Sequence, residues 1–142
     1  MYQTILLPID LNEDSSWKKA LPTALELCRS HGAKLHVMTV VPDFGMAIVG
    51  SFFPDGYEDR ALTGADKALK DFIAAHVPGD LDVTRDVCHG TVYEEILDTA
   101  KRVGADLVVM AAHRPGQADY LLGPNAARVV RHADCSVLVV RD

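Results

Sequence analysis

The stretch that decides the fold is Asp106–Asp142, DLVVMAAHRPGQADYLLGPNAARVVRHADCSVLVVRD. It begins with an unbroken apolar run, Leu107–Met110, which is typical of a strand covered on both faces in a parallel sheet. A loop over Ala112–Gly123 follows, then a helix that Asn125 can cap, and a last strand at Ser136–Arg141. A strand, a glycine-containing loop and a helix start form a common anion-binding arrangement, because free backbone N–H groups and the helix dipole face the loop.

The rest of the chain alternates between strand and helix patterns. We expect strands at Thr4–Ile9, Leu35–Val41 and Leu81–Cys88, and helices from a cap at Asp14, Ser15 or Ser16 to about Ser30, over Ala61–His76 and over Val92–Val103. We also expect Gly32 and Gly104 to end helices and Pro22 to kink the first one slightly.

The resulting β-α-β-α-β-α-β-α-β order predicts an α/β fold, a doubly wound, five-stranded parallel sheet with helices on both faces. Ligands of such folds bind beyond the carboxyl ends of the strands, where the strand order reverses. If the first and fourth strands are neighbours there, Asp10 and Met110–Arg114 face one crevice.

Length, charge and cysteine usage narrow the class of protein. A chain of 142 residues predicts a single domain over 1–142. The net charge of −6 weighs against nucleic acid and anionic membranes as partners, and no apolar run reaches the ~18 residues of a membrane-spanning helix. Cys28, Cys88 and Cys135 are odd in number and far apart, which favours small core residues in a reduced compartment. Met1 is followed almost at once by a strand, without a basic leader, so we expect a cytoplasmic protein.

The segment Pro42–Gly64 has no clear period and mixes glycine, proline and aromatic residues. A loop of this length in a compact domain is usually functional, so one interpretation is a lid over the site. A disordered insertion is the other interpretation, and the sequence leaves both open.

Three stretches resemble the universal stress protein family: PID at 8–10, DLVVMAAH at 106–113 and LLGPNAARVVRHADCSVLVVR at 121–141. The Arg-Pro after His113 and the Tyr-Leu-Leu-Gly-x-Asn string resemble its short, single-domain F/G-type branch. The resemblance implies a Rossmann-like or flavodoxin-like sheet with strand order 3-2-1-4-5, and a homodimer. Many members bind ATP through a G-x-x-G, nine residues, G-[S/T] motif.

This chain departs from that motif at several positions. Ala111 and Arg114 stand at the two first glycine positions, eight residues separate Arg114 from Gly123, and Pro124 followed by Asn125 stands at the Ser/Thr position. Pro124 removes an N–H donor, which weakens the anion cradle, although proline suits the first position of a helix. Arg114 adds a phosphate-seeking guanidinium, and Asn125 can supply replacement donors.

The predicted nucleotide-binding residues lie at strand ends and in this loop: Pro8, Ile9, Asp10, Val40, Val41, Met110, Ala111, His113, Arg114, Gly123, Pro124 and Asn125. Asp10 either contacts the ribose or a metal or caps a turn, and Arg114 either contacts phosphate or lies in solvent. His113 either contacts the ligand or packs in its loop. By resemblance, Val40 and Val41 contact adenine through their backbone. No catalytic set and no protein metal site is predicted.

Two functions remain open at this point. The first is a stress-response protein that binds ATP, or ADP or AMP, with Mg²⁺ or Mn²⁺ held mainly by the phosphates. It acts as a homodimeric binding switch and is at most a weak ATPase. The second is a nucleotide-independent interaction module of the same fold. An adenylyl-transferring enzyme is disfavoured, because no catalytic histidine motif is present. We expect the homodimer to form through the apolar strand Ser136–Arg141, which the strand order places at a sheet edge.

Overall fold

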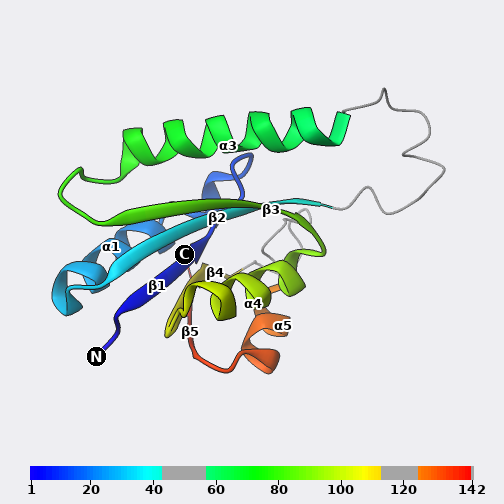
Figure 1. Ribbon diagram of the computed structural model, residues 1–142. Coiled ribbons are helices and arrows are strands. Elements are labelled where there is room, and N and C mark those ends of the chain that lie inside the picture. The colour runs from blue at the N-terminus through cyan, green and yellow to red at the C-terminus, as the bar shows by residue number, and fades with distance from the viewer. Residues whose placement is uncertain (43–56, 113–124, 142) are drawn as a thin grey trace.

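The computed structural model describes residues 1–42, 57–112 and 125–141 (Figure 1). Its centre is one parallel sheet of five strands in the order β3-β2-β1-β4-β5. The strands are β1 Thr4–Pro8, β2 Lys34–Pro42, β3 Val83–Gly90, β4 Leu107–Ala111 and β5 Ser136–Val140. The predicted fold class and strand order are therefore confirmed.

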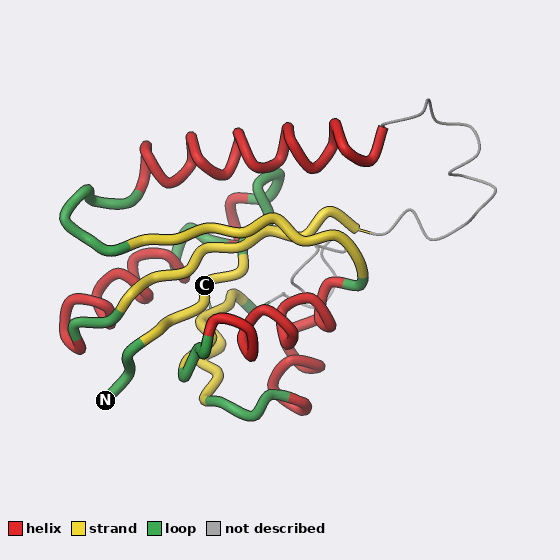
Figure 2. The backbone as a smooth tube through the Cα atoms, viewed as in Figure 1, coloured by secondary structure: helices red, strands yellow, loops and turns green. Residues whose placement is uncertain are grey.

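Helices cover both faces of the sheet. They are the short 3-10 helix η1 Asp14–Ser16 and the α-helices α1 Ala20–His31, α3 Tyr57–His76, α4 Val92–Val103 and α5 Asn125–His132. The sheet lies between two helical layers, with α1 and α3 over one face and α4 and α5 over the other (Figures 1 and 2).

The core is built around β1, which is buried from both sides. Ile5, Leu6 and Leu7 have no exposed surface. Because side chains alternate along a strand, Ile5 and Leu7 pack toward α1 and α3, and Leu6 packs toward α4 and α5. The apolar run of β4 divides between the two faces in the same way, which explains why both strands are almost continuously hydrophobic.

The helix ends follow the glycines, and α4 begins at Val92 as predicted, whereas the start of α1 corrects the sequence prediction. Gly32 and Gly104 take the left-handed conformation, with φ of 66° and 69°, and close α1 and α4 as expected. However, α1 begins at Ala20 rather than near Ser16. Pro22 lies inside α1, as expected, but in its first turn, where the missing N–H costs no helical hydrogen bond.

The helix α3 also begins earlier than predicted, at Tyr57 instead of Ala61. The loop predicted over 42–64 is therefore wrong at its end, since residues 57–64 are helical. Its middle, residues 43–56, lies outside the described residues, as does the predicted lid. The third strand is shifted by two residues, to Val83–Gly90, and the fourth and fifth strands differ from their predictions by one residue.

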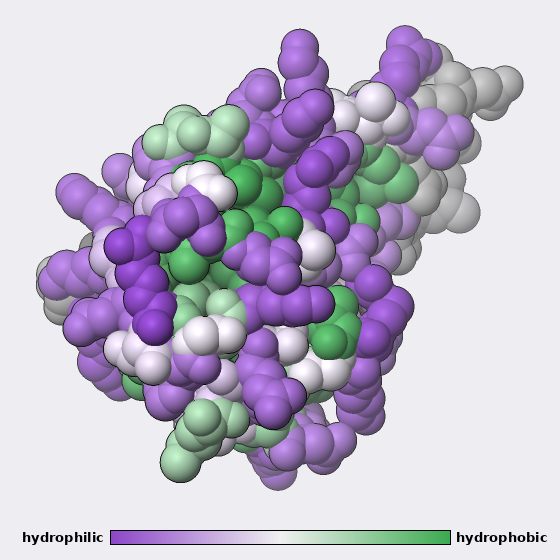
Figure 3. All heavy atoms as spheres, turned by 60° about the vertical axis from the view of Figure 1, so that its left-hand side comes forward, coloured by the Kyte–Doolittle hydropathy of each residue, from purple (hydrophilic) through white to green (hydrophobic). Residues whose placement is uncertain are grey.

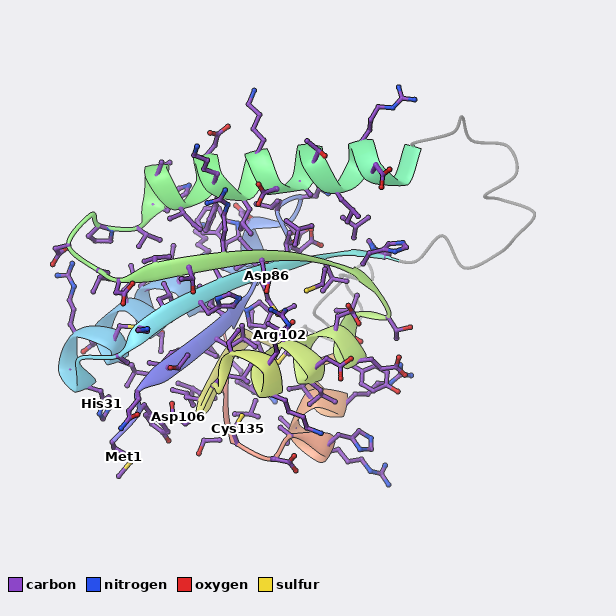
Figure 4. All side chains as sticks on the ribbon, viewed as in Figure 1. Met1, His31, Asp86, Arg102, Asp106 and Cys135 are labelled. Atoms are coloured by element: carbon purple, nitrogen blue, oxygen red, sulfur yellow. The ribbon has the colours of Figure 1, made fainter. Side chains whose placement is uncertain are left out.

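The amino end of the central strand is fixed by Asp106, which precedes β4 (Figure 4). Its carboxylate accepts the backbone N–H of Gln3 at 2.9 Å and that of Thr4 at 3.1 Å. The Asp106 N–H in turn donates to the Thr4 carbonyl at 3.0 Å. One side chain therefore sets the register with which β4 meets β1.

We predict that Asp106→Ala lowers the free energy of unfolding by about 1–2 kcal/mol, because two N–H donors lose a charged acceptor. The matched control is Asp134→Ala, which removes an exposed carboxylate 3.7 Å from Lys101 and should cost less than about 0.5 kcal/mol. Chemical denaturation of both variants measures the difference, and equal losses would contradict the role given to Asp106.

Candidate functional site

The candidate site lies where the chain reverses its direction of growth across the sheet. From β1 the chain builds β2 and β3 on one side, and it then returns to place β4 and β5 on the other. The carboxyl ends of β1 and β4 are therefore neighbours, and the loops that follow them lead to opposite faces of the sheet. Open α/β sheets bind their ligands at such a position.

Most of the predicted site residues in the described ranges come together at this edge. Pro8 ends β1, and Ile9 and Asp10 follow it directly; all three are buried. Val40 and Val41 lie near the end of β2, and Met110 and Ala111 end β4. Asn125 is the first residue of α5 rather than a residue before it. His113, Arg114, Gly123 and Pro124 lie outside the described residues.

The two carboxylate oxygens of Asp10 differ in their contacts. Oδ1 accepts the backbone N–H of Asn12 at 3.0 Å, which is the turn-capping role considered from the sequence. Oδ2 makes no hydrogen bond in the described part of the chain. The side chain is thus held in place by one of its carboxylate oxygens, and the residue is only 6% exposed.

Ser16 holds this aspartate in position, a role that the sequence analysis missed. The Asp10 N–H donates to Ser16 Oγ at 2.8 Å, and the Ser16 hydroxyl donates to the Glu13 carbonyl at 2.7 Å. Ser16 is buried at 3% exposure, so η1 folds back onto the end of β1. The only sequence feature that points to this contact is the spacing of Asp10 and Ser16, and a helix cap at Ser16 would explain that serine equally well.

The ends of β1 and β2 are tied together beyond the last paired residues. The Ile9 N–H donates to the Met38 carbonyl at 2.9 Å, and the Thr39 hydroxyl donates to the Ile9 carbonyl at the same distance. These hydrogen bonds hold the backbone next to Val40 and Val41 in place. A ligand at this edge would meet a preorganised wall instead of a free loop.

A cavity of about 240 Å³ opens between η1, the start of α1 and the ends of β4 and β5. Its lining residues are Asp14, Ser15, Lys18, Lys19, Ala111 and Val140. Only Ala111 was predicted from the sequence to belong to the site. The two lysines were missed, because nothing in the sequence shows that η1 packs against β4.

A second polar cluster lies deeper in the sheet, between β2, β3 and α4. His36 is 6% exposed, and its Nδ1 lies 2.6 Å from the Thr84 hydroxyl. Its Nε2 lies 3.4 Å from Asp86 Oδ2 without a well-aligned hydrogen bond. Asp86 itself pairs with Arg102 of α4 at 2.6 Å, and these two side chains face each other in Figure 4.

Burial lowers the pKa of His36, and the neighbouring Asp86 carboxylate partly opposes that shift. Arg102 lies on the other side of Asp86 and disfavours a second positive charge. The ring is therefore neutral near neutral pH, and the cluster ties α4 to the sheet. It lies away from the strand ends and contains no part of the candidate site.

The three cysteines are free thiols rather than disulfide partners. Cys28 is buried in the core, and that burial raises the pKa of its thiol to about 11. Cys88 and Cys135 are half-buried, and burial raises the pKa of each. All three therefore stay protonated, as expected of core residues.

Metal and membrane features were sought in the same ranges. Within residues 1–42, 57–112 and 125–141, no group of three or more His, Cys, Asp or Glu side chains is placed to hold a metal ion. None of the helices described there is long and apolar enough to cross a membrane. Hydrophilic side chains dominate the face seen in Figure 3, with apolar groups visible between them.

Comparisons with known proteins agree with this architecture. A model of the universal stress protein family matches residues 1–141. Universal stress protein G of Escherichia coli O157:H7 is 32% identical over 143 aligned positions, which cover 99% of this chain and 100% of that protein.

The chain is also similar to solved structures over almost its whole length. Universal stress protein UspA from Lactobacillus plantarum has a TM-score of 0.71 and 26% identity, and the match covers 99% of this chain and 98% of that one. A universal stress protein solved in complex with cAMP has a TM-score of 0.60 and 26% identity, with 99% and 97% covered.

We predict that His36 makes the protein less stable in mild acid. Its pKa in the folded state lies below the unfolded value of about 6.5, so the neutral ring contributes stability above that pH. This contribution is lost as the pH falls through the folded-state pKa. The free energy of unfolding, measured with denaturant, should fall more between about pH 7 and about pH 5 for the wild type than for His36→Leu. The control His132→Gln replaces an exposed histidine, so its free energy of unfolding should fall as much as that of the wild type. An equal fall in all three proteins would refute the role of His36.

Proposed function

The chain belongs to the universal stress protein family, and we propose that it binds an adenine nucleotide in the crevice between the carboxyl ends of β1 and β4. One observation supports the proposal: a buried aspartate at the switch point has one carboxylate oxygen without a hydrogen bond among the described residues. The cAMP complex of a relative at 26% identity supports an adenine nucleotide as the ligand class.

The residues present fit such a ligand. Asp10 Oδ2 would accept a hydrogen bond from a ribose hydroxyl, since carboxylates are strong acceptors. The backbone of Val40 and Val41, held by the Thr39 bond, would face the adenine. The small side chain of Ala111 allows the phosphates to approach the end of β4. The full proposed set keeps the sequence prediction: Pro8, Ile9, Asp10, Val40, Val41, Met110, Ala111, His113, Arg114, Gly123, Pro124 and Asn125.

The nucleotide would be ATP, or ADP or AMP, and the protein would act as a binding switch in the stress response, with at most slow ATP hydrolysis. A Mg²⁺ or Mn²⁺ ion would be held mainly by the phosphates, because the described residues offer no cluster of metal ligands. We propose a single domain over 1–142 that works in the cytoplasm, which the free thiols support.

We also propose a homodimer through the outer edge of β5. This strand ends the sheet, and Leu138 on it is 38% exposed. The Val140 carbonyl accepts the Ala112 N–H at 2.8 Å, so the polar groups of Val140 point toward β4. The N–H and C=O of Val139 therefore point to the open edge, where the same strand of a second copy can pair with them.

The nucleotide proposal predicts measurable binding of ATP with Mg²⁺ by calorimetry. Asp10→Asn should weaken it about ten-fold, because the amide oxygen can still accept the Asn12 N–H while the charged acceptor is lost. Asp82→Asn makes the same change at the amino end of the sheet and should leave the affinity unaltered. No heat and no shift in melting temperature at millimolar ATP would favour the nucleotide-independent interaction module instead.

The dimer proposal predicts a particle of 30.8 kDa, twice the 15.4 kDa chain, by light scattering. Val139→Pro should give monomers, because it removes a donor from the open edge and leaves the inward hydrogen bonds of β5 in place. Val139→Thr keeps that donor and a β-branched shape, so it should remain dimeric. A wild-type mass of one chain at micromolar concentration would overturn the dimer.

A further inference from the structure

The cavity beside Ala111 is lined by charged side chains that have no role in the site described so far. Its two lysines and one carboxylate, Asp14, leave one net positive charge in a protein whose net charge is −6. Neither Lys18 nor Lys19 makes an ion pair in the described part of the chain. Two cations therefore stand at a concave surface, and among residues 1–42, 57–112 and 125–141 no carboxylate pairs with either of them.

The position of these lysines in the chain is also unfavourable without a ligand. They directly precede α1, whose first turn holds no acidic residue, so two positive charges lie at the positive end of the helix dipole. By contrast, α4 has Glu94 and Glu95 in its first turn and basic residues in its last turn. An anion in the cavity would interact favourably with both ammonium groups and with the start of α1.

The size and place of the cavity indicate which anion. At about 240 Å³ it falls below the ~300–1,000 Å³ that enclose whole ligands. It suits a group such as a short phosphate chain better than a complete nucleotide. Ala111 and Val140 place it at the carboxyl edge of the sheet, beside the crevice described above.

We propose that this cavity binds the phosphate chain of the nucleotide, with Lys18 and Lys19 as its counter-charges. The identity of the ligand rests on the proposed function, whereas the affinity of the cavity for phosphate groups does not. The two lysines then replace part of the anion cradle that Pro124 weakens in the sequence. The Ser15 hydroxyl also lies at the rim, but it donates its one proton to Glu13 Oε1 at 3.2 Å and would have to turn away from that carboxylate to donate to a phosphate.

The test compares the double variant Lys18→Gln/Lys19→Gln with the wild type and with Lys67→Gln/Lys70→Gln. The control pair removes the same charge from exposed positions of α3. Each protein is titrated with ATP, adenosine and sodium tripolyphosphate. Heat is recorded by calorimetry, and the fluorescence of Trp17, the only tryptophan and the residue before Lys18, provides a second signal.

We expect the Lys18/Lys19 variant to lose ATP affinity by about ten-fold or more and to keep its adenosine affinity, while the control matches the wild type. An unchanged ATP affinity, or an equal loss for adenosine, would overturn the proposal while nucleotide binding itself stands. If the wild type binds neither ATP nor adenosine, the proposed function fails. Tripolyphosphate binding that requires Lys18 and Lys19 would then still support the cavity, and its absence would reject it.

Discussion

The structure depends on one constraint, the burial of β1 on both faces between two parallel neighbours. Ile5, Leu6 and Leu7 are fully buried, so the strand has no face on which a polar side chain could stand. Its neighbours β2 and β4 come from opposite halves of the chain. Because β1 must be covered on both faces, α1 packs on one face and α4 on the other. The chain segments that follow β1 and β4 therefore lead to opposite faces of the sheet. The candidate site lies between these diverging segments, so its position follows from how the two faces of β1 are covered.

The fold could be predicted because apolar runs mark strands, and glycines mark helix ends, from the local sequence alone. The run Leu107–Met110 and the closing glycines Gly32 and Gly104 fix elements wherever they occur. The start of α1 could not be predicted as well, because Ser16 bonds to the backbone of Asp10 and Glu13 rather than capping that helix. The start of α3 was obscured by Gly64, which disfavours a helix locally but has open space around its α-carbon.

The candidate site divides in the same way. The position of Asp10, Val40 and Met110 at one edge could be predicted because the ends of parallel strands meet at one edge of a sheet, a rule that needs only the strand pattern. Lys18 and Lys19 could not, because their part in the cavity depends on η1 packing against the end of β4. His36 shows the same limit: its strand is recognisable from the sequence, but the Asp86–Arg102 pair beside it joins β3 to α4.

The short segment from Asp10 to Lys19 joins the two halves of the proposed binding mode. Ser16, in its middle, fixes the backbone of Asp10, and Lys18 follows two residues later with its N–H on the Asp14 carbonyl at 2.8 Å. A ribose contact at Asp10 and a phosphate contact at the lysines would thus be made by one rigid turn. The adverse charge at the start of α1, which costs about 0.3–1 kcal/mol for each such group, is tolerable because Ala20, Leu21 and Ala24 anchor that helix in the core. Binding energy from the phosphates would therefore hold the same turn that orients Asp10, so sugar and phosphate recognition would reinforce each other.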